Sequence, residues 1–352
     1  VWISSRSEAH FKEASMKKIL LIFASFAMLS FLRSSLVIAA DVNWDAVPAN
    51  TVNFFYTGVA SWEFLTSNDH GVGRVPVVKK KKTCRECHIS KDGTFDIQVP
   101  EITKGSLTMK ASRKSFEPNP IPNKPAMIDA MFQVTYDSDY VYVRMQWNSA
   151  GKSWNSADDD KNDKPDRVAI QMNLSNAEFS KFGCFIACHN DQNSMPDSPS
   201  KDKVAKHPYY AKLKRDDVRL YAFYSRNDGW SSLKDNKAID ELLTGDGLID
   251  LWTANFKGKN TEFMDQWILE DRKEDHKDIE GSGNWNDGKY TVIFKRKLNT
   301  GDNKDVPIKD GSTVTIGIAI HDDKAKLRQH YVSFPMIIGF GAKGFINATK
   351  IK

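Results

Sequence analysis

All four cysteines of the 352-residue chain lie in two short segments, and in each segment the second cysteine is followed directly by a histidine. The segments are TCRECHIS, with Cys84, Cys87 and His88, and FGCFIACHND, with Cys184, Cys188 and His189. No cysteine is left over for a structural disulfide, which is the usual use of cysteine in exported proteins. The sequence therefore predicts a fold built around two cysteine–histidine sites.

The first segment has the spacing C-x-x-C-H, which is the attachment pattern of c-type haem. Two thiols at this spacing add to the two vinyl groups of haem, and the adjacent histidine then lies under the iron as its proximal ligand. A redox-active cysteine pair is one alternative. A zinc site formed by all four cysteines is another, although it would leave both histidines without a role.

The second segment has three residues between Cys184 and Cys188 instead of two. One extra residue can loop out while both sulfurs still reach haem and His189 still reaches iron. We therefore predict a second haem c here, so that the cofactors are two haems c. A haem bound without one or both thioether links is the alternative.

Each haem iron needs a second axial ligand or stays open. His70, in SNDHGVGR, is the candidate nearest to the first motif. For the second motif the candidates are His330, Met172 and Met195, although a methionine within an apolar strand is more often part of a core. His207, His276 and His321 stand in polar, charged surroundings and are predicted to be surface residues.

The N-terminal region has the pattern of an export signal. From Met16, two lysines precede an apolar stretch that ends in small residues before Asp41. This order is typical of a secretory signal peptide, which we assign to residues 16–40, with residues 1–15 upstream of the true start. No second apolar run is long enough to cross a membrane, so we expect an exported protein without a membrane span.

Composition excludes one class of partner. The 50 Lys and Arg residues and 45 Asp and Glu residues are mixed along the chain, whereas nucleic-acid binding requires a concentrated basic face. The basic run Lys79–Lys82 is interpreted as a solvated loop or as a docking patch for an acidic electron partner. The acidic run Asp158–Asp166 lacks the spacing of an EF-hand and is interpreted as a solvated turn.

Beyond the proline-rich stretch at Pro118, short runs of β-branched and aromatic residues alternate with turn signals, which predicts strands. They are a hairpin at Met131–Trp147 and strands at Asp166–Leu174, Asp217–Ser225, Lys289–Leu298 and Ser312–Asp322, with turns at Asn286–Gly288 and Lys309–Gly311. Asn190–Asp216 and Asp228–Glu280 are expected to be loops or short helices. The predicted class is mainly β: an immunoglobulin-like β-sandwich at 118–352, preceded by a loop and helix haem c segment at 41–117.

The order of several segments resembles a known family. YDSDYVYVRMQW, DRVAIQMN, FGCFIACH, NDGKYTVIFKRKL, GSTVTIGIAIHDD and HYVSFPMIIGF, within Pro125–Phe345, are similar to the haem-binding domain of ethylbenzene-dehydrogenase-type gamma subunits. The resemblance implies a β-sandwich that holds one haem. Its members with non-covalent haem use Met and Lys as axial ligands. His330 takes the place of that lysine and His189 would lie opposite, so the ligand set departs from the family pattern.

The N-terminal part, with FFYTGVASWEFL, DHGVGR and TCRECH, resembles an extra mono-haem segment of exported diheme members, in which the DHG histidine, His70 here, is the distal ligand. Two haems on such a subunit look like the gamma subunits of nitrite oxidoreductases. The resemblance implies an electron-transfer subunit that works with a molybdenum catalytic subunit, an iron–sulfur subunit and a soluble c-type cytochrome. Its location would be the periplasm or the anammoxosome lumen.

No catalytic site of its own is expected, because the sequence contains no defensible nucleophile or phosphate-binding loop. Two other functions stay open at this point: a stand-alone exported diheme carrier, and a haem-based sensor or enzyme with an open iron site.

Overall fold

The computed structural model describes residues 42–352, apart from residues 92–94, 152–164, 258–259, 276, 323–324 and 326. The chain divides into two compact units, Val1–Asn43 and Trp44–Lys352, and the described strands and helices belong to the second. The expected signal peptide at 16–40, residues 1–15, His276 and most of the acidic run Asp158–Asp166 lie outside the described residues.

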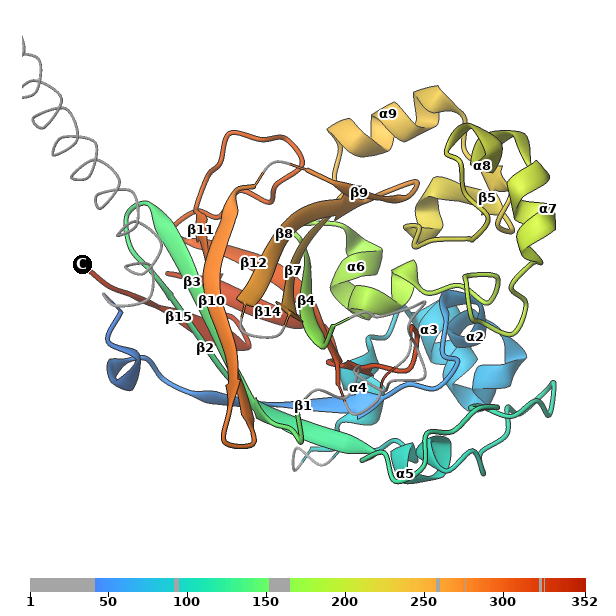
Figure 1. Ribbon diagram of the computed structural model, residues 1–352, viewed down its shortest axis with the longest axis horizontal. Helices are drawn as coiled ribbons and strands as arrows, with labels where there is room; N and C mark the ends of the chain where they lie inside the picture. The colour runs from blue at the N-terminus through green and yellow to red at the C-terminus, as the bar shows by residue number, and fades with distance from the viewer. Residues whose placement is uncertain are drawn as a thin grey trace, which may run out of the picture. The chain divides into compact units, whose positions relative to one another are not determined.

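Most strands of this unit belong to one 13-stranded sheet, shown in Figure 1. Its hydrogen-bonded order is β10, β11, β3, β2, β1, β13, β12, β4, β7, β8 and β9, and β14 and β15 connect β12 to β2. The bounds are β1 Asn50–Tyr56, β2 Met127–Tyr136, β3 Tyr140–Asn148, β4 Arg167–Asn173, β7 Ile249–Lys257, β8 Asn260–Ile268, β9 Arg272–Glu274, β10 Ile279–Asn286, β11 Lys289–Lys297, β12 Ser312–His321, β13 Tyr331–Val332, β14 Met336–Phe340 and β15 Ile346–Lys350. β5 (Arg226–Asp228) and β6 (Ser232–Leu233) form a separate pair.

The sheet curves into a barrel-like shape around an apolar interior. Strands from its two ends approach each other, and the Thr261 hydroxyl of β8 donates to the Gly283 carbonyl of β10 at 2.6 Å. Phe132, Trp252 and Ile316 are among the apolar side chains that line a small cavity inside. The mainly β class is confirmed, while the immunoglobulin-like sandwich stays a prediction.

The predicted hairpin at Met131–Trp147 and the predicted turn at Asn286–Gly288 both form. β2 and β3 pair through Tyr136 and Val141, and the Asp137 carboxylate accepts from the backbone N–H groups of Asp139 and Tyr140 at 2.7 Å. At the turn between β10 and β11, Asp287 and Gly288 have φ values of 48° and 77°. A tight two-residue turn requires positive φ at both positions, and an Asp-Gly pair supplies it.

The secondary-structure predictions for two segments are wrong. Asp217–Ser225 is not a strand: it is irregular and ends in a short 3-10 helix, because Val218 and Tyr221 pack into a separate small cluster with Tyr210 instead of pairing with the sheet. The region Asp228–Glu280 is not mainly loop, since it contains β7 and β8. β7 is buried from Ile249 to Asn255 despite its polar residues, so it lacks the alternation that marks a half-exposed strand.

Short helices gather to one side of the sheet in Figure 1. The α-helices are α2 Trp62–Thr66, α3 Arg74–Lys80, α4 Cys84–His88, α5 Val99–Thr103, α6 Ala177–Phe182, α7 Lys201–Lys206, α8 Pro208–Lys212 and α9 Asn236–Thr244. The 3-10 helices are η1 Trp44–Ala46, η2 Asn68–Gly73, η3 Gly183–Ala187 and η4 Phe223–Ser225. Within the described ranges, no helix has the length and apolar character needed to cross a bilayer.

Candidate haem sites

The first motif forms helix α4. The helix begins at Cys84 because Thr83 caps it: the Thr83 hydroxyl accepts from the Glu86 N–H at 3.3 Å, and the Glu86 carboxylate accepts from the Thr83 N–H at 2.7 Å. In a helix, residues three and four apart lie on the same side. The cap therefore presents both thiols and His88 from one helical turn.

His70 lies opposite His88. The chain folds back through α3, and the two imidazole centroids are 6.2 Å apart with their planes inclined by 28°. Two imidazoles that bind one metal through facing nitrogens, each at about 2 Å, have centroids roughly 6 Å apart. The pair therefore fits the two axial positions of one iron.

Both imidazoles are oriented by backbone carbonyls. His70 Nδ1 lies 3.0 Å from the Leu65 carbonyl oxygen, and His88 Nδ1 lies 2.9 Å from that of Asp96. A carbonyl partner at Nδ1 fixes the tautomer and leaves Nε2 for a metal. Burial lowers the pKa of His70 below its ordinary value, and His88 lowers it further, which favours the neutral form that binds metals.

The surroundings of this pair also fit a haem. Val72 and Val75, beside His70 and at the start of α3, are 95% and 44% exposed, which leaves apolar surface for a haem to cover. Gly73 gives room to the ligand, because a Cβ there would lie 2.5 Å from His70 Nε2.

The alternatives for the first motif find no support. Burial raises the pKa of Cys84 to about 12, whereas a redox-active pair needs a thiol with a lowered pKa. Zinc would need the four cysteines in one cluster, and among the described residues the only group of three or more potential ligands within metal-binding distance contains no cysteine. All four cysteines are free thiols.

The second motif rests on the sheet. Cys184, in η3, is buried against Gly317 of β12, where a Cβ would lie 2.7 Å from the Cys184 sulfur. His189 is buried, with Nδ1 3.0 Å from the Glu63 carboxylate and Nε2 3.3 Å from the Tyr221 carbonyl oxygen. A carboxylate at Nδ1 is a usual outer partner of a metal-bound histidine. His189 therefore fits a ligand role if Nε2 gives up its 3.3 Å contact with the Tyr221 carbonyl oxygen.

The expected opposite ligands of the second iron are not brought to His189. His330 packs against His321, with ring centroids 4.4 Å apart, and no ring contact joins it to His189 among the described residues. Met172 pairs with Ile316 and faces the apolar interior, whereas Gly317 and Cys184 lie on the other face of the sheet. Met195 is buried in the turn that follows His189.

The prediction that His321 lies at the surface is wrong. Its side chain is at the end of β12 and only 8% exposed. Burial lowers its pKa well below the ordinary value, and burial also lowers the pKa of His330 to about 4. Both imidazoles are therefore neutral, and His321 joins the ligand candidates. His207 is partly buried between the rings of Tyr210 and Trp230.

Helix α2 orients histidines of both motifs, which the sequence alone did not reveal. Its Glu63 carboxylate binds His189, and its Leu65 carbonyl binds His70. Burial raises the pKa of Glu63, but the hydrogen bond and charge of His189 outweigh it and lower the pKa overall. The only sequence signal was an acidic residue inside the otherwise apolar SWEFL.

Phenylalanine rings lie between the two motifs. Phe185, next to Cys184, is 6.3 Å from Phe55, and Phe55 is 5.0 Å from Phe334 (all centroid distances). Phe334 in turn lies 6.3 Å from the His88 ring, and Phe95 packs on both Phe55 and Phe334. A packed aromatic cluster therefore connects the second motif to His88 of the first.

Comparison with known families identifies the class. Residues 97–277 and 259–333, together more than half of the chain, match the family described as ethylbenzene dehydrogenase. The chain belongs to this family, which confirms the resemblance drawn for Pro125–Phe345. The closer resemblance to nitrite oxidoreductase gamma subunits stays a prediction.

Two curated relatives match over almost their whole length. A protein called cytochrome c-552, from Stutzerimonas stutzeri, is 29% identical over 95% of this chain and 100% of its own length. Cytochrome c-551, from Rhodocyclus tenuis, is 24% identical over 88% of this chain and 99% of its own.

Solved structures offer only weak likeness. A carbohydrate-binding protein from Bacteroides uniformis, itself of uncertain assignment, aligns with 63% of this chain and 74% of its own at a TM-score of 0.30 and 8% identity. A family 9 carbohydrate-binding module from Caldicellulosiruptor kristjanssonii in complex with cellotriose covers 59% of this chain and 65% of its own, at a TM-score of 0.26 and 9% identity. Such scores carry no functional argument.

Proposed function

We propose that the chain is an exported c-type cytochrome that carries electrons on two haems c. Cys84 and Cys87 attach the first haem, with His88 and His70 as its axial ligands. Cys184 and Cys188 attach the second, with His189 as one ligand. His330 is the proposed opposite ligand of that haem, with Met172 as the alternative.

The observation that carries this proposal is the pair of neighbouring imidazoles, His70 and His88, at the first motif. Their 6.2 Å centroid separation and the carbonyl partner on each Nδ1 fit two ligands of one iron. Two strong ligands leave no open position for a substrate, so the first site suits electron transfer better than catalysis. The second site is less complete, because His330 must leave His321 to face His189.

Haem iron, when bound, accepts and releases one electron at a time. The protein's part is to orient the imidazoles and to exclude water. Leu65 and Asp96 fix the first pair through backbone oxygens, and Glu63 fixes His189 through a charged hydrogen bond. Outer partners of this kind increase the basicity of the histidine, so they also help to set the reduction potential of each site.

We infer further that this cytochrome is the electron-transfer subunit of a molybdenum oxidoreductase complex of the nitrite oxidoreductase type. It would pass electrons between the iron–sulfur subunit and a soluble c-type cytochrome. Membership of the ethylbenzene dehydrogenase family supports this placement. In the same proposal, residues 41–117 are the mono-haem segment and 118–352 the immunoglobulin-like haem domain, located in the periplasm or the anammoxosome lumen.

A stand-alone diheme carrier is the second candidate. It is favoured by the relative from Stutzerimonas stutzeri, which is called a cytochrome and matches this chain from end to end of its own sequence. Purification from the native organism separates the two candidates. Co-purification with molybdenum and iron–sulfur subunits supports the complex, and a chain that elutes alone under mild conditions supports the free carrier.

Covalent haem is tested motif by motif. We expect the wild-type chain to keep two haems through denaturing electrophoresis. The double variants Cys84→Ser/Cys87→Ser and Cys184→Ser/Cys188→Ser should each keep one. A wild-type chain without retained haem contradicts the proposal. If one double variant loses all haem staining and the other stains as strongly as wild type, the chain carries a single covalent haem. Carbon monoxide binding to the reduced wild-type protein would instead favour a sensor or enzyme with an open iron site.

A further inference from the structure

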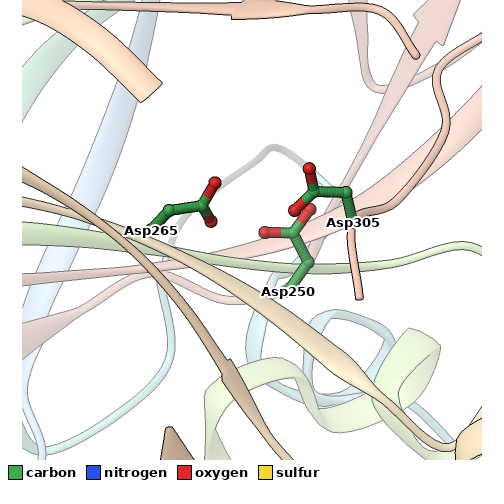
Figure 2. Close-up of side chains that lie close together, drawn as sticks. All are labelled: Asp250, Asp265 and Asp305. Carbon is green, nitrogen blue, oxygen red and sulfur yellow. The ribbon is translucent and has the colours of Figure 1, made fainter. Parts of the chain in front are cut away.

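Three aspartates meet inside the barrel, away from both cysteine motifs. Asp250 lies on β7, Asp265 on β8 and Asp305 in the loop between β11 and β12. Their exposed fractions are 0%, 4% and 9%. Figure 2 shows the three carboxyl groups turned toward one another, and one oxygen of each lies within 4.8 Å of the others.

Strand pairing explains how two of these residues meet. Across β7 and β8, Asp250 pairs with Trp267 and Trp252 pairs with Asp265. Side chains two residues apart on a strand lie on the same face, and so do cross-strand partners. Asp250 and Asp265 are therefore diagonal neighbours on the inner face of the sheet.

The described residues supply hydrogen bonds and ion pairs to only some of these carboxylate oxygens. Arg296, fully buried, lies 2.6 Å from an Asp250 oxygen and 3.7 Å from an Asp305 oxygen. The Val306 N–H also donates to Asp250. One oxygen of each aspartate, namely Asp250 Oδ1, Asp265 Oδ1 and Asp305 Oδ2, is buried without any hydrogen-bond partner.

Three carboxylates and one guanidinium leave a net charge of −2 on the ionised cluster. Burying charge without a partner costs several kcal/mol per ion, and Asp278 and Asp302 add repulsion from nearby. Accordingly burial, as the largest cause, raises the pKa of Asp265 to about 8 and that of Asp250 to about 6. The buried cluster therefore needs additional positive charge, supplied either by a bound cation or by protons on the carboxylates.

We propose that Asp250, Asp265 and Asp305 bind one divalent cation of the calcium class, which fixes β7, β8 and the β11–β12 loop together. The donors are all oxygen, which hard cations prefer. Calcium takes oxygens at about 2.3–2.6 Å, so opposite ligands lie roughly 5 Å apart, whereas magnesium at about 2.0–2.1 Å needs a tighter set. The three carboxylate oxygens lie within 4.8 Å of one another and are buried, which favours calcium, because magnesium gives up its bound waters reluctantly.

The test is calcium binding and its effect on the intact haem-loaded protein at pH 8. After dialysis against EGTA, equilibrium dialysis with radioactive calcium should give one bound ion per chain. Thermal unfolding should then occur about 4 °C higher in calcium than in EGTA, if the calcium concentration is a hundredfold above the dissociation constant. Magnesium chloride at equal ionic strength should give a smaller shift.

Asp265→Asn is the informative variant, because Arg296 forms its close ion pairs with Asp250 and Asp305 and attracts Asp265 only at longer range. We expect it to unfold at the same or a higher temperature than wild type in EGTA, since it removes a buried charge, and to lose both the bound ion and the calcium shift. Glu280→Gln, which removes a carboxylate from a half-exposed pair with Lys295, is the control and should keep both.

Two results would overturn the proposal. One is a wild-type protein that binds no calcium and unfolds at the same temperature in calcium and EGTA, which would mean that protons alone balance the cluster. The other is equal calcium binding by wild type and Asp265→Asn, which would place the ion elsewhere.

Discussion

Gly73→Ala tests the proposed distal ligand of the first haem without touching the histidine itself. Gly73 has φ −68° and ψ −27°, a helical conformation that alanine adopts without strain. Gly73 is also the N-cap of α3, where glycine is preferred to alanine by less than about 1 kcal/mol. A loss of haem ligation in the variant must therefore come from what the new methyl group touches.

The methyl group meets the coordinating atom. A Cβ at this position would lie 2.5 Å from His70 Nε2 and 2.7 Å from Cε1. The ring must move by about 0.9 Å to restore a contact of 3.4 Å, yet metal–ligand distances tolerate only about 0.2 Å. The Leu65 carbonyl holds Nδ1 from the other side. We therefore expect the bond from His70 to the first iron to be lost while the fold is kept.

Absorption and electron paramagnetic resonance spectra of the ferric protein are the assay. In Gly73→Ala one of the two haems should change from low-spin to high-spin, and after reduction it should bind carbon monoxide. His70→Ala should give the same spectra. Asn68→Ala is the control, because Asn68 is exposed in the same 3-10 helix and is not part of the apolar surface beside His70. Wild-type spectra in Gly73→Ala, with no carbon monoxide binding, would remove His70 from the ligands.

Three further predictions concern other contacts. Glu63→Gln weakens the charged hydrogen bond to His189 by about 1 kcal/mol. In a redox titration the potential of the second haem should rise by on the order of 50 mV, while that of the first stays unchanged. Two unchanged potentials would contradict the role of Glu63. Gly317→Ala pushes on the Cys184 sulfur and should cost about 1–3 kcal/mol, with loss of covalent haem at the second motif alone on a haem-stained gel. Arg296→Met leaves the buried aspartates without their cationic partner. Urea unfolding in the presence of EGTA should show a free energy of unfolding lower by about 3–5 kcal/mol. A loss below about 1 kcal/mol would show that the cluster is neutral.

Strands with a local signature could be predicted from the sequence. The hairpin of β2 and β3 and the strands β4, β11 and β12 combine β-branched runs with clear turn residues, and they form where expected. β3 shows the reason most plainly, because its residues alternate between buried and partly exposed from Tyr140 to Trp147. Alternation is a property of the strand itself and needs no knowledge of its neighbours.

Strands whose character depends on neighbours could not be predicted. β7 buries Asp250, Thr253 and Asn255 because other strands and Arg296 surround them. Polar residues of this kind indicate a loop when they are read alone. Asp217–Ser225 is the reverse case: it alternates like a strand, but Val218 and Tyr221 pack in a satellite cluster while Ala222 packs in the main core.

In the candidate sites, too, local features could be predicted from the sequence, whereas contacts between distant segments could not. The Cys-His motifs are contiguous in sequence, and His70 is brought back to His88 by the short helix α3 between them. Glu63 meets His189 only because α2 and η3 are neighbours in the fold, 126 residues apart in the chain. The aspartate cluster likewise combines two strands and a loop, so no spacing rule such as that of an EF-hand could find it.

The two motifs lie against one face of one sheet, and this determines how they are coupled. Cys184 rests on Gly317 of β12, while Phe55 of β1 pairs with Val332 of β13, which in turn pairs with Ala319. Residues paired across strands share a face, as do residues two apart, so Gly317, Ala319 and Phe55 all face the same side. The spacing between the motifs is thus set by a hydrogen-bonded sheet and a packed aromatic cluster, rather than by the long stretch of chain between them. If both haems are bound as proposed, this scaffold need not rearrange for them to exchange an electron. The direction of transfer is then decided by the two potentials, and hence by the outer partners of the histidines.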